Sequence, residues 1–187
     1  MEQQRLVQIS KTMSKALRHK PESLGLNPTI SGWVGVDTLL AALNRKGFGI
    51  SRAELEEVVA KNDKQRFSFD QQKENIRANQ GHSIEVNLGL SPLEPPEFLF
   101  HGTTSQALGL VLELGLQRMK RHHVHLSLDT QTALRVGNRH GKAVLLRIKA
   151  LEMYRQGYDF FCSENGVWLA DEVPPRFLEV INPVVSR

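Results

Sequence analysis

Basic and titratable residues gather in short segments of the chain, and the first of these is Leu17-Arg18-His19-Lys20-Pro21. The residue before a proline avoids helical dihedral angles, so the segment lies at the end of a predicted helix. Cationic side chains are favourable there, because the helix dipole is negative at its C-terminus. The alternative is an anion clamp, in which Arg18 grips a phosphate with two hydrogen bonds and His19 adds a titratable donor.

Two further segments carry the same pair of interpretations. Asp63-Lys64-Gln65-Arg66-Phe67 precedes a predicted strand, and Gln80-Gly81-His82-Ser83 follows the next one. Each can be an ordinary polar loop or turn. Each can also face a ligand, since glycine lets the backbone come close and the neighbouring side chains supply cationic and polar atoms. The candidate residues are Lys64, Arg66, Gln80, His82 and Ser83.

The densest basic run is 118–125, which includes Arg121, His123 and His125. In a strand, His123 and His125 would share one face, so a metal site has to be weighed. No cysteine and few carboxylates lie nearby to complete a ligand set, and we therefore predict no metal. Arg139-His140-Gly141 can contact an anion or can simply end a helix.

His101-Gly102-Thr103 comes at the end of an apolar strand and directly before a helix. Backbone amides in such a turn can face a phosphate or an amide ligand, although a strand-turn-helix with glycine is also common without a ligand. Glu164 could act as a catalytic carboxylate, but Asn165-Gly166 after it indicates a turn.

Several reaction classes lack their motifs. No motif pairs two carboxylates as glycosidases do. Neither GxGxxG nor GxxxxGK[ST] occurs, which disfavours Rossmann and P-loop chemistry. No Ser-His-Asp set and no reactive-cysteine context is evident.

The first half of the chain is predicted to be mainly helical. Leu6, Ile9, Met13, Ala16 and Leu17 form one apolar side of a helix. A short extended piece at 32–34 is followed by a helix N-capped by Asp37, a helix opened by the capping box at 51–54, and strands at 66–69 and 76–78. This is the element order of a winged helix.

Three prolines within 91–96 predict a stiff, extended connector. Beyond it, short strands are expected at 98–100, 124–126, 143–146, 167–169 and 177–180, with helices at 105–114 and 130–136. The sequence therefore predicts an α+β protein with two lobes, over residues 1–90 and 97–187.

The composition is that of a folded, mildly basic protein. The 187 residues include 24 Lys and Arg against 20 Asp and Glu, for a net charge of +4. This charge suits an anionic partner. One cysteine, the absence of an apolar leader and the absence of a membrane-length apolar run predict a cytoplasmic protein with no membrane association. No obligate protein partner is evident.

The order of the motifs is more distinctive than any one of them. Together they closely resemble the KptA-type RNA 2'-phosphotransferases, NAD-dependent enzymes of tRNA splicing, over residues 10–180. The segments that carry the resemblance are 17–21, 63–67, 77–83, 101–103, 121–127, 136–141 and 165–169.

The resemblance implies a winged-helix-like RNA-binding lobe followed by an ADP-ribosyltransferase-like mixed β lobe that binds NAD. It also implies an Arg-His-Arg-Arg catalytic set at Arg18, His19, Arg66 and Arg121. His101 resembles the histidine that many ADP-ribosyltransferases place against the cofactor, and Val167 occupies the place of their catalytic glutamate. The remaining expected NAD contacts are Gly102, Thr103, Ser127, Arg139 and His140, and those expected for the RNA substrate are Lys64, Gln80, His82 and Ser83.

The implied reaction moves an internal RNA 2'-phosphate to NAD. It yields 2'-hydroxyl RNA, ADP-ribose 1'',2''-cyclic phosphate and nicotinamide. Such a phosphate is already an anionic nucleophile, so positioning and charge complementarity suffice. Three alternatives remain: an ADP-ribosyltransferase acting on nucleic-acid ends or protein, a non-enzymatic RNA-binding module, and a metal-dependent hydrolase.

Overall fold

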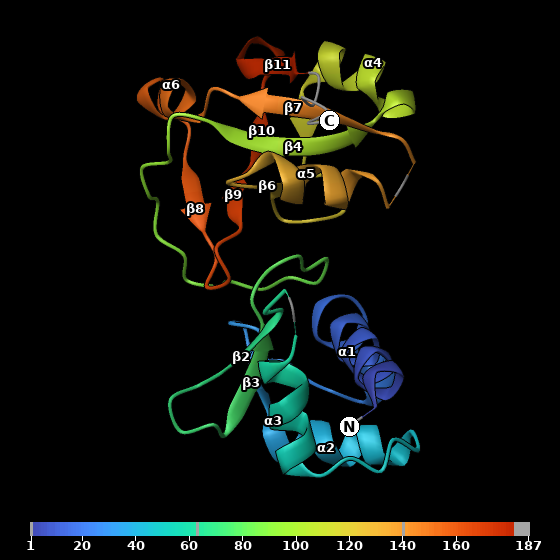
Figure 1. Ribbon diagram of the computed structural model, residues 1–187. Helices are drawn as coiled ribbons and strands as arrows, with labels where there is room; N and C mark the ends of the chain where they lie inside the picture. The colour runs from blue at the N-terminus through green and yellow to red at the C-terminus, as the bar shows by residue number, and fades with distance from the viewer. Residues whose placement is uncertain (1, 63, 140, 182–187) are drawn as a thin grey trace. The chain divides into compact units, whose positions relative to one another are not determined.

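The computed structural model describes residues 2–62, 64–139 and 141–181. The chain divides into two compact units, Met1–Gly89 and Leu90–Arg187, each with its own hydrophobic core (Figure 1). Both units mix helices with small antiparallel sheets, which confirms the α+β class. Among the described residues, no helix is long and apolar enough to cross a membrane.

Helix α1, Gln3–Arg18, provides one wall of the core of unit 1. All five residues of its predicted apolar side are buried, so the predicted helix is confirmed. Pro21 ends the helix as expected and begins a short 3-10 helix, Pro21–Leu24. The chain thus turns sharply straight after Arg18 and His19, which leaves these two side chains at the end of a firmly packed helix.

Helix α2, Val36–Arg45, starts one residue earlier than its expected cap, and the prediction that Asp37 is the N-cap is wrong. Gly35 holds the cap position, and the Val36 amide donates to the Glu74 carbonyl at 2.8 Å. Because strand pairing runs directly into the helix, its first amide already has an acceptor. Asp37 lies exposed in the first turn, 3.7 Å from the Arg52 guanidinium.

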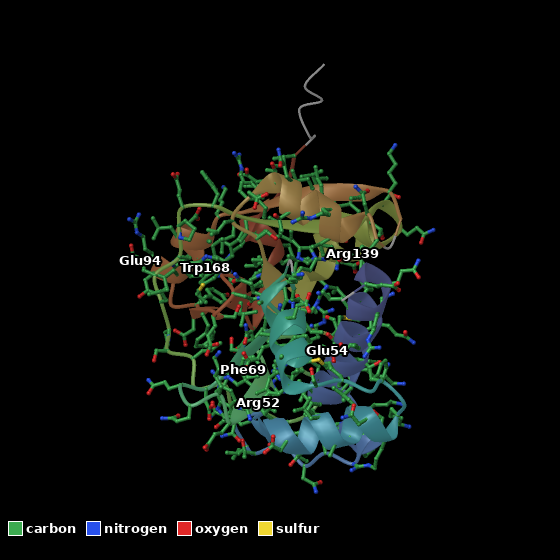
Figure 2. The ribbon with its side chains drawn as sticks, turned by 60° about the horizontal axis from the view of Figure 1, so that its bottom comes forward. Arg52, Glu54, Phe69, Glu94, Arg139 and Trp168 are labelled. Carbon is green, nitrogen blue, oxygen red and sulfur yellow. The ribbon has the colours of Figure 1, made fainter. Side chains whose placement is uncertain are left out.

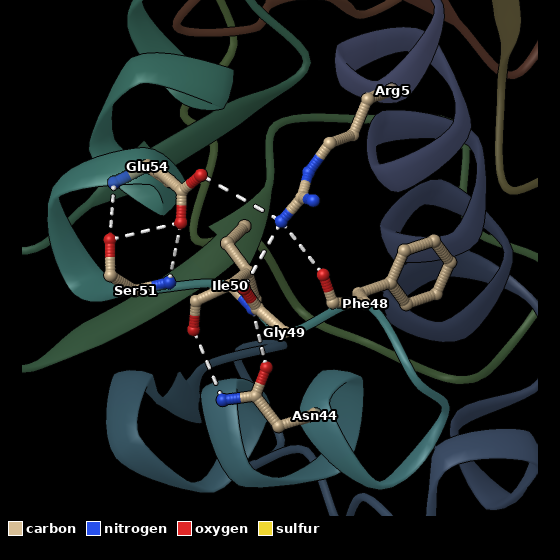
Figure 3. Close-up of polar contacts among 7 residues, drawn as sticks. All are labelled: Arg5, Asn44, Phe48, Gly49, Ile50, Ser51 and Glu54. Atoms are coloured by element: carbon tan, nitrogen blue, oxygen red, sulfur yellow. Dashed lines mark hydrogen bonds and ion pairs between the residues drawn. The ribbon is translucent and has the colours of Figure 1, made fainter.

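Helix α3, Arg52–Ala60, begins with the predicted capping box, in which Ser51 and Glu54 satisfy each other's backbone amides (Figure 3). The Arg5 guanidinium reaches the same Glu54 at 3.7 Å and donates to the Phe48 carbonyl at 2.8 Å. Asn44 fixes the connection from α2 by bonding both backbone groups of Ile50. These contacts hold the helices of unit 1 together at one end.

The sheet of unit 1 is antiparallel, in the order β1-β3-β2. Its strands are β1, Val34–Gly35; β2, Phe67–Phe69; and β3, Asn75–Ala78. Phe67 pairs with Ala78 and Phe69 with Ile76, so residues 67–78 form the expected hairpin. The element order matches the predicted one, and Arg66 lies immediately before β2.

Unit 2 contains three small antiparallel sheets, in the orders β11-β7-β4, β6-β9-β8 and β10-β5 (Figure 1). The strands are β4, Leu99–Thr104; β5, Leu116–Gln117; β6, Val124–Leu126; β7, Ala143–Ile148; β8, Phe160–Cys162; β9, Trp168–Ala170; β10, Glu172–Val173; and β11, Leu178–Ile181. The helices are α4, Ser105–Leu114; α5, Thr130–Gly137; α6, Ala150–Arg155; and a 3-10 helix, Pro175–Phe177.

The predicted strands and helices of unit 2 are confirmed with shifts at their ends, but α6, β5, β8 and β10 were not predicted. The expected strand at 167–169 is displaced by one residue, because the Val167 amide bonds the Ser163 hydroxyl in the β8–β9 turn. The expected connector at 91–96 forms no helix or strand. Its Leu93 amide donates to the Phe160 carbonyl at 2.8 Å, within unit 2.

Strand β4 continues through Thr104, so His101-Gly102-Thr103 lies at the end of this strand, just before α4, as expected. These residues pair with Leu146, Leu145 and Val144 of β7. Gly102 has a packing role in this strand. Because it has no side chain, α5 can lie directly against β4. A Cβ at Gly102 would overlap the Ala133 carbonyl oxygen and would lie 3.0 Å from the Gly137 amide.

We expect Gly102→Ala to destabilise unit 2 by about 1–3 kcal/mol, since a methyl group has no room between β4 and α5. Gly109→Ala is the matched control, because Gly109 lies in α4 with nothing within 4 Å of an added Cβ. The control should stabilise the protein by roughly 0.5–1 kcal/mol through helix propensity. Hydrogen exchange of the β4 and β7 amides measures both effects. Equal exchange rates in the two variants would contradict the close-contact explanation.

Candidate functional site

The first candidate cluster lies at the C-terminal end of α1. His19 is the C-cap of the helix, and its Nδ1 lies 2.9 Å from the Ser83 hydroxyl. The Ser83 amide donates to the Arg18 carbonyl, also at 2.9 Å. A segment 64 residues further along the chain therefore fastens the turn that carries Arg18 and His19.

Arg66 joins the same cluster from the start of β2. An Arg18 Nη2 donates to the Arg66 carbonyl at 3.5 Å, and the Asn79 amide donates to that carbonyl at 2.9 Å. The guanidinium of Arg66 donates through Nη1 to the Asn62 side-chain oxygen at 3.0 Å. The structure thus brings together Arg18, His19, Arg66 and Ser83.

The other predicted substrate contacts of unit 1 surround this cluster at different depths. Lys64 is half-buried, and its amide donates to the Asn62 side-chain oxygen at 3.3 Å. Gln80 is half-buried next to Asn79. His82 is 1% exposed, and its Nε2 lies 3.7 Å from the position that a Cβ would take at Gly32. The His82 ring therefore packs within unit 1, while its neighbours Gln80 and Ser83 are more accessible.

The second candidate cluster lies in unit 2, where β4 and β6 run close together. His101 of β4 places its Nδ1 2.9 Å from the carbonyl oxygen of His125 in β6. The His125 Nδ1 lies 3.0 Å from an Arg121 Nη1. A guanidinium can only donate, so His125 accepts this bond and carries its own proton on Nε2. His101, His125 and Arg121 thus form a chain of contacts.

Burial lowers the pKa of His101, and the nearby Arg121 charge lowers it further. The neutral ring must carry its proton on Nδ1, because the His125 carbonyl can only accept. The Nε2 atom of His101 therefore retains a lone pair. It can accept a hydrogen bond from a hydroxyl or amide group of a ligand.

The remaining predicted cofactor contacts differ in position. Ser127 and Phe100 exchange two backbone hydrogen bonds, so Ser127 lies opposite the residue that precedes His101, and Thr103 is buried two residues along β4 from His101. Gly102 faces α5. Arg139 is exposed just after α5 (Figure 2), and Val167 is half-buried in the β8–β9 turn. His140 lies outside the described residues.

The two histidines that were weighed as metal ligands, His123 and His125, have different partners. His123 precedes β6, where its Nε2 lies 3.8 Å from an Asp171 carboxylate oxygen and its ring packs on Phe161. In the described ranges, no group of three or more His, Cys, Asp or Glu side chains could hold a metal ion.

Sequence reasoning missed two residues of these clusters as site residues. His125 was considered only as a metal ligand, although its nitrogen contacts Arg121. Asn62 was not considered. An asparagine after a helix often bonds the amide two residues ahead, and this Asx-turn signal was available in the sequence.

Two arginine-histidine clusters define a protein equipped to handle anionic groups. The family model for RNA 2'-phosphotransferase, Tpt1 / KptA family, matches residues 4–172. A probable RNA 2'-phosphotransferase of Trichormus variabilis is 56% identical over 97% of this chain and 100% of its own length. Those of Nostoc punctiforme and Herpetosiphon aurantiacus are each 52% identical, covering 97% and 95% of this chain and 100% and 98% of their own lengths.

The chain therefore belongs to the RNA 2'-phosphotransferase, Tpt1 / KptA family, and it is an enzyme of that class. This confirms the resemblance seen in the sequence and rules out the non-enzymatic RNA-binding module.

We expect unit 2 to lose stability as the pH falls below about 6.5. His101 and His123 both have folded-state pKa values below their ordinary 6.5, so the unfolded state binds more protons in that range. Each group can contribute a slope of at most about 1.4 kcal/mol per pH unit, between 6.5 and its folded-state pKa.

The variant His101→Asn isolates one of the two contributions, because its amide can still donate to the His125 carbonyl but does not titrate. Unfolding measured between about pH 5 and pH 8 should then show a shallower slope than in the wild type. An unchanged slope would mean that His101 is not held neutral by the fold.

Proposed function

We propose that this enzyme uses NAD as its co-substrate and that its two clusters divide the reaction between them. The cluster of Arg18, His19 and Arg66 binds the internal 2'-phosphate of RNA, and the cluster of His101, His125 and Arg121, together with Ser127, binds NAD. Unit 1 then acts as a winged-helix-like RNA lobe and unit 2 as an ADP-ribosyltransferase-like lobe. The convergence of Arg18, His19 and Arg66, from segments 48 residues apart, is the observation that carries the proposal.

The proposed reaction has two displacements. A 2'-phosphate oxygen bonds to the anomeric carbon of the nicotinamide ribose, and the bond to nicotinamide breaks. The adjacent ribose 2''-hydroxyl then attacks phosphorus, the bond from phosphorus to the RNA 2'-oxygen breaks, and that oxygen takes a proton. The products are 2'-hydroxyl RNA, ADP-ribose 1'',2''-cyclic phosphate and nicotinamide.

The unit 1 cluster suits the first displacement because it contains two arginines, and Arg18 contacts the main chain of Arg66. Guanidinium groups stay protonated and can bind two phosphate oxygens at once. His19 lies beside Ser83 and can donate a hydrogen bond or move a proton. Lys64 is close to Arg66 in the sequence, and Gln80 is close to Ser83, so their side chains can add contacts to the RNA. The buried ring of His82 supports a role in shaping the cluster.

The residues of unit 2 fit a dinucleotide that offers hydroxyl, amide and phosphate groups. The free lone pair on His101 Nε2 can accept from a ribose hydroxyl or from the carboxamide of the nicotinamide. Ser127 and Thr103 add hydroxyl groups on neighbouring strands, and Arg121 offers a guanidinium for phosphate. Arg139, His140 and Val167 complete the proposed set, and Gly102 serves it by allowing α5 to support β4.

The decisive experiment uses an oligoribonucleotide with one internal 2'-phosphate, incubated with and without NAD and followed by mass analysis of all products. We expect 2'-hydroxyl RNA and a cyclic phosphate of ADP-ribose with NAD and no turnover without it. EDTA should leave the rate unchanged. RNA or protein that ends carrying ADP-ribose would favour the ADP-ribosyltransferase alternative, and inhibition by EDTA reversed by Mg²⁺ would favour a metal-dependent hydrolase.

Arg121→Ala and Arg18→Ala should slow different displacements if the clusters divide the labour. Arg18→Ala should slow nicotinamide release by roughly 10²–10³, the loss typical of one charged contact in a transition state. Arg121→Ala should slow the second displacement more, so that RNA carrying ADP-ribose accumulates in a single-turnover time course. If saturating NAD instead restores normal turnover in Arg121→Ala, then Arg121 only binds NAD and the proposed division is wrong.

A further inference from the structure

Asn62 is a buried carboxamide at the centre of the segment that carries Arg66. It follows the C-cap of α3, and it is 5% exposed. Its side-chain oxygen accepts from Arg66 Nη1 at 3.0 Å, from the Arg66 amide at 3.4 Å and from the Lys64 amide at 3.3 Å. One oxygen atom therefore fixes both the backbone of this segment and the direction of the guanidinium.

The orientation of the Asn62 carboxamide is determined by its surroundings. The groups on the Arg66 side are all N–H donors, so the oxygen must face them and the NH2 group must face away. On that other side, Nδ2 donates to the Ser10 hydroxyl at 2.7 Å. Ser10 is also 5% exposed, which makes this hydrogen bond costly to break.

Ser10 lies on the same helix as Arg18, with His19 at its cap. An α-helix rises about 1.5 Å per residue, so Ser10 and Arg18 are rigidly spaced about 12 Å apart along α1. Through Ser10 and Asn62, α1 therefore sets the position of Arg66 as well as that of its own terminal residues. Arg18, His19 and Arg66, the three residues proposed to bind one phosphate, are thus all held by α1, either directly or through Ser10 and Asn62.

We propose that Asn62, oriented by Ser10, is a positioning residue that aims Arg66 at the 2'-phosphate. This inference rests on the proposed function, which makes Arg66 a phosphate-binding residue. The neutral amide oxygen directs the guanidinium without neutralising its charge. An aspartate in the same place would still accept from the guanidinium, but it would place a negative charge beside it.

The test measures single-turnover nicotinamide release at saturating NAD with 2'-phosphorylated RNA. Asn62→Ala should slow release by roughly 10- to 100-fold, because a misplaced catalytic group loses that much rate. In an Arg66→Ala background, Asn62→Ala should cause no further loss. Asn62→Asp keeps an acceptor for Arg66 but loses the donor to Ser10, so it should be less stable than the wild type and slow. Ser10→Ala should show a smaller loss of rate than Asn62→Ala.

Asn44→Ala is the matched control, since it removes another carboxamide of the same unit, whose two hydrogen bonds join it to the Ile50 backbone (Figure 3). It should lower stability and leave the rate unchanged. The inference is overturned if Asn62→Ala slows Arg66→Ala by the same factor as it slows the wild type, or if Asn62→Asp reacts at the wild-type rate. A normal rate in Arg66→Ala would instead remove Arg66 from the proposed function, and this inference with it.

Discussion

Helix α1 is held in unit 1 by the burial of one continuous apolar side, and this burial also fixes the groups at its C-terminal end. Ile9, Met13 and Leu17 are fully buried at spacings of four residues. Each such side chain contributes about 1.5–3 kcal/mol when it is removed from water. The helix therefore cannot rotate without exposing its core side. Arg18 and Ser10 belong to the same helix, so the burial of its apolar side also fixes their positions in the polar cluster.

In unit 2, a strand packed against a helix positions the candidate residues. Strand β4 carries His101 and Thr103 on alternate positions, and Gly102 between them lies against α5. The absence of a side chain at Gly102 lets the helix backbone approach the strand, and α5 contacts β4 along its length (Figure 1). Gly102 thus allows α5 to support β4, while its neighbours His101 and Thr103 carry polar side-chain atoms.

Local sequence patterns predicted much of the fold because their causes are local. The apolar spacing of α1 and the capping box at Ser51 depend on residues within one or two helical turns. Asp37 misled because the sequence does not show that strand pairing with Glu74 already satisfies the first amide of α2. Strands β5 and β10 have two residues each, too few for an alternating pattern to be recognised.

The candidate site was predictable by resemblance but not from spacing. The order of the motifs pointed to Arg18, His19, Arg66 and Arg121, whereas the residue types alone fitted helix ends and polar loops equally well. The acceptors that orient Arg66 and Arg121 lie only four residues away in the sequence, but other contacts of the unit 1 cluster join distant segments. Asn62 bonds Ser10 across 52 residues, and no periodicity reports such a pair. The tautomers of His101 and His125 likewise follow only from which atoms face them.

In each of the two clusters, an arginine donates a hydrogen bond to an uncharged acceptor. Arg66 donates to an amide oxygen, and Arg121 donates to an imidazole nitrogen. Both acceptors are neutral, so neither places a negative charge beside the guanidinium that it orients. A carboxylate would orient an arginine more strongly, but it would repel an incoming phosphate dianion at the same short distance. For the phosphate dianion of the proposed reaction, a neutral acceptor is therefore the better support, because it adds no negative charge near the bound phosphate.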